Sequence, residues 1–232
     1  MTSVANTVPG TATLPTVSRA EAARYALLRR LAPSMRHHLV VNLQPIGMIY
    51  EVMDRRLRAP QPDLADVHDS AQKINGFARA ALHSCLDVVT WLAPEEDVLT
   101  SVNDGVRECL GLLTTSLTFR GYSVRNEVAP VPGEIHRLAI RNVLTAALLH
   151  LTDENPSPAD LVLTVLPAPD SVQLTLTLRP TDGEQGFPAE LTYRRIEASD
   201  LEALAAAESV QVTADGKQRL CLSIPLARPL AV

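Results

Sequence analysis

Two adjacent histidines, His37 and His38, stand in a stretch whose apolar residues recur every three or four positions. At about 100° per residue, these apolar side chains share one side of a helix, and His37 points to the opposite side. The apolar residues are Leu28, Met35, Leu39, Leu43, Ile46, Tyr50, Met53 and Leu57. Imidazole is substantially neutral and nucleophilic near pH 7. His37, which would face water or a partner from a rigid helix, is therefore a candidate acceptor of a phosphoryl group.

A small surface surrounds His37 on the same predicted helix. Val41, Gln44 and Met48 lie within about 40° of its direction, which puts two apolar side chains on a face that would otherwise be solvated. Exposed apolar side chains beside a reactive group indicate a docking surface. The expected contact residues for a partner are Arg36, His38, Val41, Gln44 and Met48. Two other interpretations stay open: His37 is an ordinary solvated histidine, or His38 is itself the acceptor.

The element that holds His37 is predicted to be the first half of a helical hairpin. Residues 18–21, Ser-Arg-Ala-Glu, have the form of a capping box, and the helix that follows runs to residue 57 with kinks expected at Pro33 and Pro45. Asp63 is a suitable N-cap for a second helix. The apolar or small residues of that helix alternate steps of three and four: Leu64, Val67, Ala71, Ile74, Ala78, Ala81, Cys85, Val88 and Leu92. Two helices alone cannot enclose a core, so residues 18–94 are predicted to form a dimeric four-helix bundle.

From residue 95 onward the pattern is that of mixed structure. We expect helices near 97–118 and 134–151, and a short helix capped by Ser199 or Asp200. The expected strands are Tyr122–Val128, Leu161–Leu166 and Val172–Leu178, followed by a hairpin of Val210–Thr213 and Arg219–Leu226. This order predicts an α/β two-layer sandwich over residues 95–232. The fold class is therefore α+β, with residues 1–17 as a loose, disordered tail.

Other polar and aromatic residues have simple structural interpretations. The pair Arg29-Arg30 is typical of an exposed helix face, and Asp153-Glu154 of a solvated helix end. Phe77 and Trp91 are expected in the core or in a seam between the domains. Histidines and cysteines do not recur at metal-ligand spacings, so no metal site is predicted.

Charge and cysteine content restrict the partners and the compartment. The formal net charge of −5 argues against a general nucleic-acid binder. Residues 19–58 nevertheless carry eight arginines against three acidic residues, a net charge of +5, which favours an acidic partner. Three cysteines without close spacing indicate a reducing compartment. Because no stretch is long and apolar enough for a membrane span and the first residues do not have the form of a signal peptide, we expect a cytoplasmic protein.

The stretch from His37 to Ile46, His-His-Leu-Val-Val-Asn-Leu-Gln-Pro-Ile, resembles a known motif. In one subgroup of bacterial sensor histidine kinases the histidine box reads His-Arg-Val-Lys-Asn-Asn-Leu-Gln-Val-Ile. The histidine, the second asparagine, the Leu-Gln pair and the final isoleucine match without gaps, which puts His37 in the phosphoacceptor's place. Over about residues 19–226 the order of elements also resembles these kinases, which have a dimerisation and phosphotransfer hairpin followed by a Bergerat-type ATPase domain.

The resemblance fails at the nucleotide-binding boxes. Ala146 and His150 stand where the family's Asn-x-x-x-Asn motif holds Mg²⁺ and phosphate. Asp182 and Gly186 stand near the family's Asp-x-Gly-x-Gly box, at the wrong spacing and late in register. No glycine occurs around residues 198–201, where the lid's Gly-x-Gly is expected. The resemblance therefore implies a degenerate ATPase domain that holds no nucleotide cofactor.

Dimeric histidine phosphotransferases keep this architecture without the ATPase chemistry, and the chain resembles them. The resemblance implies a homodimer that relays phosphoryl groups between receiver-domain aspartates of response regulators in a two-component phosphorelay. The receiver would supply the Mg²⁺, and the phosphotransferase the nucleophile and a docking surface. Two alternatives remain: an ATP-dependent histidine kinase with an atypical nucleotide site, and a non-catalytic adaptor that binds receivers through the same surface.

Overall fold

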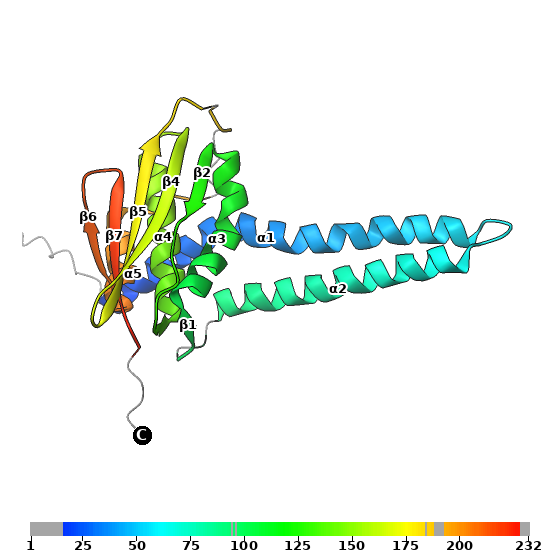
Figure 1. Ribbon diagram of the computed structural model, residues 1–232, viewed down its shortest axis with the longest axis horizontal. Helices are drawn as coiled ribbons and strands as arrows, with labels where there is room; N and C mark the ends of the chain where they lie inside the picture. Colours follow the sequence, from blue (N-terminus) through cyan, green and yellow to red (C-terminus); the bar gives the residue numbers. More distant parts are fainter. Residues whose placement is uncertain (1–15, 94, 96, 184, 188–192, 228–232) are drawn as a thin grey trace, which may run out of the picture.

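A helical hairpin projects from an α/β body in the computed structural model, which describes residues 16–93, 95, 97–183, 185–187 and 193–227 (Figure 1). Helix α1 (Thr16–Leu57) and helix α2 (Leu64–Leu92) form the hairpin. As predicted, Asp63 caps α2, because its Oδ1 accepts a hydrogen bond from the Ala65 amide at 2.8 Å. Most of the expected loose tail lies outside the described residues. Helix α1 already includes Thr16, so Ser18 is not its N-cap and the capping-box prediction is wrong.

Helix α1 runs unbroken through Pro33 and Pro45. A polar contact fixes its register against α2, since Asn42 Nδ2 donates to the buried Ser84 Oγ at 2.9 Å and also to the His38 carbonyl oxygen at 3.3 Å. The asparagine that matches the histidine box therefore joins the two helices close to the histidines.

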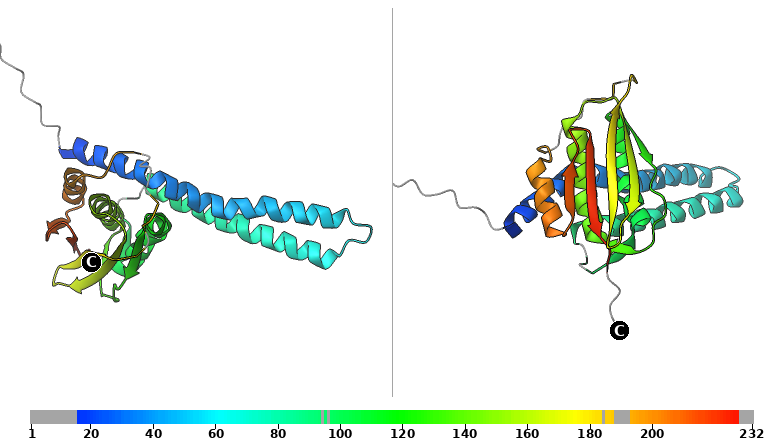
Figure 2. Two further views of the ribbon diagram at one scale, coloured as in Figure 1. Left: turned by 90° about the horizontal axis from the view of Figure 1, so that it is seen from above. Right: turned by 60° about the vertical axis from the view of Figure 1, so that its left-hand side comes forward.

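The α/β body consists of a mixed five-stranded sheet with helices against one face (Figure 2). The strand order is β2-β4-β5-β7-β6, and only β2 pairs in parallel with its neighbour, β4. The strands are β2 (Tyr122–Asn126), β4 (Ala159–Pro167), β5 (Ser171–Pro180), β6 (Gln211–Ala214) and β7 (Arg219–Pro225). The helices are α3 (Val102–Phe119), α4 (Arg137–Glu154) and α5 (Ala198–Ala207). The predicted fold class, a helical hairpin followed by an α/β two-layer sandwich, is confirmed.

Three local predictions are wrong. The helices expected to begin near residues 97 and 134 begin later, because the residues at their starts form two short strands, β1 (Leu99–Ser101) and β3 (Glu134–His136). These strands pair with each other in antiparallel orientation. Helix α5 is capped by Glu197 and not by Ser199 or Asp200. Asp200 is the third residue of the helix, and its carboxylate accepts a hydrogen bond from the Glu197 amide at 3.0 Å.

The first half of α1 is part of the α/β core, where it lies across the helices on the side away from the sheet (Figure 2). Small and apolar residues on one side of it are buried: Ala20, Ala23, Ala26, Leu27, Leu31 and Met35. Burial of such side chains contributes about 25 cal/mol per Å² of apolar surface. Helix α1 is therefore continuous from the body into the hairpin, and His37 lies at the point where α1 leaves the body.

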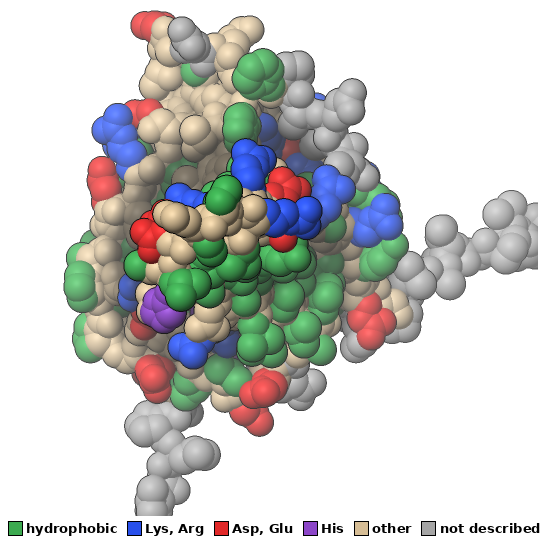
Figure 3. Space-filling view, turned by 90° about the vertical axis from the view of Figure 1, so that its right-hand side faces the viewer, with side chains coloured by type: hydrophobic (Ala, Val, Ile, Leu, Met, Phe, Trp, Pro, Cys, Tyr) green, Lys and Arg blue, Asp and Glu red, His purple; other side chains and the backbone are tan. Residues whose placement is uncertain are grey.

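The apolar stripes of the hairpin divide into two series in the protomer. On α2, Val67, Ile74, Ala81 and Val88 are buried or half-buried, whereas Leu64, Ala71, Ala78, Cys85 and Leu92 are exposed. On α1, Leu39, Ile46 and Met53 are half-buried, whereas Leu43, Tyr50 and Leu57 are exposed. Each series repeats every seven residues, so each marks one side of its helix. Figure 3 shows hydrophobic side chains gathered along one side of the hairpin. We call Leu43, Tyr50, Ala78, Cys85 and Leu92 the outward seam.

Candidate functional site

His37 lies on the exposed surface of α1, as the helical periodicity predicts, and so does His38. The His37 ring lines a pocket of about 180 Å³ between α1 and α3. From α1 the pocket is lined by Pro33, Ser34, His37 and His38, and from α3 by Leu112, Thr115, Ser116 and Phe119. His37 is therefore accessible to a partner on one side and lies next to the α/β body on the other.

The other predicted contact residues surround His37 without being covered. Arg36, Val41, Gln44 and Met48 are all exposed on α1. Val41 and Met48 are large apolar side chains, so the protomer leaves apolar surface uncovered beside the candidate acceptor. Their contact with a partner stays a prediction.

His38 lies at the junction of two pockets. Besides the pocket at His37, it lines a larger one of about 420 Å³ between the end of α2 and α3. This second pocket is lined by ionisable residues, among them Asp87, Asp104, Arg107, Glu108 and Arg137. Arg107 pairs with Asp104, and Arg137 pairs with Glu108 at 2.8 Å. The two histidines therefore share the pocket beside the C-terminal half of α3, and His38 in addition lines the pocket of ionisable residues.

The α3 residues beside His37 were not among the predicted site residues. Thr115, Ser116 and Phe119 are more than 70 positions away along the sequence, and only the packing of α1 on the body brings them to the histidine. One signal was available in the sequence. The chain has three phenylalanines, and the periodicity of α3 puts Phe119 away from its buried residues Leu113 and Leu117.

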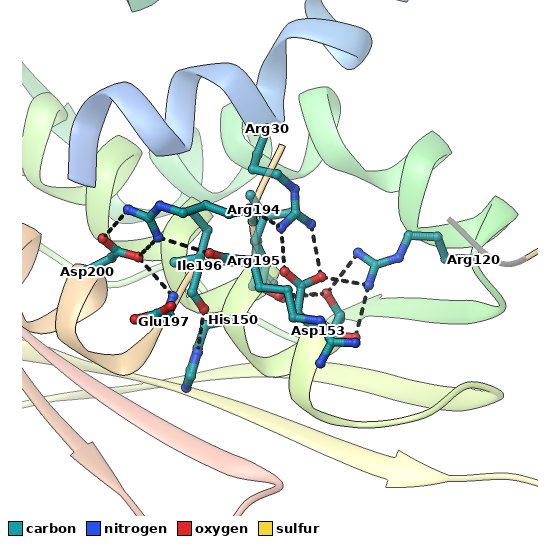
Figure 4. A network of polar contacts seen from close by, with 12 residues as sticks. Arg30, Arg120, His150, Asp153, Arg194, Arg195, Ile196, Glu197 and Asp200 are labelled. Atoms are coloured by element: carbon teal, nitrogen blue, oxygen red, sulfur yellow. Dashed lines mark hydrogen bonds and ion pairs between the residues drawn. The ribbon is translucent and has the colours of Figure 1, made fainter. Parts of the chain in front are cut away.

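A buried ion-pair network attaches α1 to the body one heptad before His37 (Figure 4). Arg30 Nη1 and Nη2 donate to Asp153 at 2.5 and 2.9 Å, and Arg120 donates to the same carboxylate at 2.9 Å. Arg30 also donates to the Arg194 carbonyl oxygen at 3.2 Å. Two predictions fail here: Arg30 is not on an exposed helix face, and Asp153 is not at a solvated helix end. Each is buried because the other neutralises it.

A second network of hydrogen bonds holds the segment before α5 in contact with α5 and α4 (Figure 4). Arg194 donates to both oxygens of Asp200, at 2.5 and 2.8 Å. These hydrogen bonds, together with that from the Glu197 amide, hold the pKa of the Asp200 carboxyl below its ordinary value, although burial raises it. His150 Nδ1 donates to the Ile196 carbonyl oxygen at 2.8 Å. The helix α5 and its capping contacts thus occupy the region that the resemblance assigns to a glycine-containing lid.

The residues at the nucleotide-binding positions do not fit the group that the resemblance expects there. Ala146 is fully buried and offers no ligand atom, and the His150 Nδ1 is engaged with the backbone. Gly186 has a packing role, because a Cβ at this position would lie 2.1 Å from the backbone of Arg120 and Gly121. Among the described residues, no group of three or more His, Cys, Asp or Glu side chains is placed to hold a metal ion.

A third network joins the end of α2 to the body. Arg141 donates to the Thr90 carbonyl oxygen at 2.8 Å, pairs with Glu108, and lies over the ring of the buried Trp91 at 4.7 Å. Burial raises the pKa of the Glu108 carboxyl, but the hydrogen bonds and charges of Arg137 and Arg141 outweigh it, so the net pKa is lowered. Trp91 therefore lies in the seam between hairpin and body, as predicted, and both helices of the hairpin are attached to the body.

Comparison with known proteins gave no match to a family model and none to a curated protein. Among solved structures, the chain is similar to a histidine kinase from Burkholderia phymatum, with 17% identity and a TM-score of 0.44 over 93% of this chain and 100% of that one. It is similar to a bacterial phosphotransferase, with 14% identity and a TM-score of 0.42 over 94% and 100%. It is also similar to the histidine kinase AdeS of Acinetobacter baumannii, with 13% identity and a TM-score of 0.42 over 79% of this chain and 98% of that one. Likenesses of this size do not assign an activity.

None of the helices in the described part of the chain combines the length and the apolar character that crossing a bilayer requires.

Proposed function

We propose that the chain is a histidine phosphotransferase that relays phosphoryl groups between receiver-domain aspartates. The observation that carries the proposal is the position of His37, an exposed imidazole at the rim of a pocket on α1. Two ion pairs, Arg24 with Glu208 and Arg30 with Asp153, anchor this helix to the body. A nucleophile in a fixed position with an open approach is what a phosphoryl acceptor needs, since positioning and charge neutralisation dominate phosphoryl transfer.

The proposed step is a displacement at phosphorus. The lone pair of a neutral His37 ring nitrogen forms the N–P bond while the bond between phosphorus and the aspartyl oxygen breaks, and the aspartate leaves as a carboxylate. The other ring nitrogen keeps its proton. The reverse step passes the phosphoryl group to a second receiver, which restores the neutral imidazole. In this account the receiver brings its own Mg²⁺ and acidic residues, and the arginine-rich α1 attracts that acidic surface.

A homodimer is part of the proposal. The outward seam leaves Leu43, Tyr50 and Leu92 exposed in the protomer, and the heptad spacing of the seam is what a second hairpin would require to complete a four-helix bundle. His37 lies about 120° around α1 from Leu43. Pairing through the seam would therefore cover the apolar side chains and leave the candidate acceptor accessible.

ATP-dependent kinase activity is the first rival function. It is disfavoured by Ala146 and by the engaged His150, which offer no replacement for the asparagines that hold Mg²⁺ in the kinases. A non-catalytic adaptor is the second rival, and it would use the same docking surface without needing the His37 ring. We propose a cytoplasmic protein, as expected from the cysteine content.

A receiver screen tests the proposal. Receiver domains, each phosphorylated with radiolabelled acetyl phosphate and Mg²⁺, are freed of the small-molecule donor and mixed with the chain for seconds. We expect at least one to transfer label to the chain, and labelled ATP with Mg²⁺ alone to transfer none. Label from ATP without a receiver would favour the kinase, and stable receiver binding without any transfer would favour the adaptor.

A further inference from the structure

Among the described residues, the side chains that line the surface from His37 across α3 are uncharged, although charged residues make up 20% of the chain and Arg120, Asp153 and Arg195 line a further pocket beyond Phe187. Of the described residues, no Asp, Glu, Lys or Arg lines the pocket at His37 or an adjoining pocket of about 480 Å³. The adjoining pocket is lined by Thr114, Thr115, Thr118, Phe119, Gly121, Gln185, Gly186 and Phe187. Thr115 and Phe119 line both pockets, so the two form one continuous surface.

Two of the three phenylalanines of the chain lie on this surface. The exposed fractions of Phe119 and Phe187 are 64% and 77%. Their backbones are joined, because the Phe187 amide donates to the Phe119 carbonyl oxygen at 2.9 Å. Gly186 holds this segment in place, since its close approach to the backbone of Arg120 and Gly121 leaves no room for a Cβ. The two aromatic side chains are therefore exposed from a fixed backbone.

The composition of the surface is that of the centre of a protein interface. Such centres are depleted in charge and enriched in aromatic side chains, and a few aromatic anchors supply most of the binding energy. We call Thr115, Phe119 and Phe187 the α3 patch. A nucleotide or other anion would need cationic groups to neutralise its charge, and no described Lys or Arg side chain lines these two pockets.

The position of the patch identifies its occupant. A standard interface covers about 800 Å² on each partner, a disc of roughly 16 Å radius. A protein that brings a phosphoryl group to His37 must cover the pocket that His37 shares with Phe119. A second copy of the chain is the other possible occupant, but the outward seam lies on a different side of α1 from His37.

We propose that the α3 patch is the second half of the receiver-docking surface, so that a receiver contacts the α/β body through Phe119 and Phe187 while its aspartyl phosphate reaches His37. This inference rests on the proposed function. It gives the degenerate ATPase domain a role in partner recognition: the receiver binds the junction of hairpin and body, and not the bundle alone.

The test uses the full-length chain and the receiver domain that labels it fastest in the screen. Phe119→Ala and Phe187→Ala are compared with Leu166→Ala, a matched control whose side chain is also 64% exposed but lies at the β4–β5 end of the sheet. We expect each phenylalanine variant to raise the receiver Kd roughly tenfold or more. At saturating receiver the transfer rate constant should stay within about twofold of wild type, because His37 is intact. The Leu166 variant should behave as wild type.

Thr115→Arg provides a second variant in case a phenylalanine variant misfolds. It adds bulk and charge to both pockets from an exposed position without removing apolar packing, and it should weaken receiver binding to a similar degree. If His37 is labelled normally and all three patch variants bind the receiver as wild type does, the inference is wrong and the phosphotransferase function stands. If no receiver labels the wild-type chain, the proposed function fails and the inference fails with it.

Discussion

Arg30 and Asp153 form a buried ion pair between the hairpin helix α1 and the body, with Nη1 and Oδ2 2.5 Å apart and 5% and 1% of the side chains exposed. Arg30 lies seven residues before His37 and therefore on the same face of α1. Because Arg120 also donates to Asp153 at 2.9 Å, the carboxylate is held from both sides. The candidate acceptor thus projects from a helix whose position is fixed by a buried charge.

Removal of Arg30 should destabilise the fold. We expect Arg30→Ala to lower the free energy of unfolding by about 3 kcal/mol, at the lower end for a broken buried pair because Arg120 still faces Asp153. The melting temperature should fall by roughly 6–12 °C for a chain of this size. Arg29→Ala, at the neighbouring exposed position where the guanidinium lies over Tyr193, should cost no more than about 1 kcal/mol. An equal decrease in the free energy of unfolding in the two variants would show that the buried ion pair does not hold α1 against the body.

Stability should decrease in acid through Asp200. Its folded-state pKa lies below the ordinary value of 3.8, chiefly because Arg194 hydrogen-bonds the carboxylate. A lowered pKa contributes stability that is present above pH about 4 and is lost as the pH falls through the folded-state pKa. Urea midpoints measured between about pH 6 and pH 3 should therefore fall more steeply for wild type than for Asp200→Asn. The same dependence of the urea midpoint on pH in both proteins would contradict the role assigned to the Arg194–Asp200 pair.

The sequence predicts those features that depend on periodicity. The exposure of His37 follows from its angle to the half-buried Leu39, and the Asp63 cap follows from the residue type before a regular stripe. The three-residue strands β1 and β3 could not be predicted, because neither is long enough to show alternation. Arg30 and Asp153 were assigned to exposed positions since the sequence shows each charge without its partner, 123 residues away. The proximity of Phe119 to His37 depends in the same way on tertiary packing.

The outward seam should control dimerisation separately from the hairpin fold. Leu43→Glu puts a charge in the proposed bundle core, so the variant should sediment as a folded monomer. Ile74→Glu puts the charge between α1 and α2, so it should instead lower the melting temperature or cause aggregation. Val52→Glu is the control, because Val52 is 45% exposed, close to the 50% of Leu43, and lies on the opposite side of α1. A wild-type chain that is monomeric at micromolar concentration would contradict the bundle.

ATP should not stabilise the chain. A ligand at 100 times its Kd adds about 2.7 kcal/mol to the stability of the folded state, a rise in melting temperature of roughly 5–11 °C here. With Ala146 and His150 in place of the metal-holding asparagines, we expect a change below about 1 °C in millimolar ATP and Mg²⁺. Thermal denaturation with and without the nucleotide measures this, and a saturable upward shift would favour the kinase alternative.

Transfer of labelled phosphate from a receiver to single histidine variants tests the central proposal most directly. His37→Gln should abolish acid-labile, base-stable labelling while the dimer, the melting temperature and receiver binding stay close to wild type, because an exposed substitution costs little stability. His38→Gln should still be labelled. Label that is lost only in His38→Gln would move the acceptor by one position, and label that persists in the double variant would show that the chain is not a histidine phosphotransferase acting through this site.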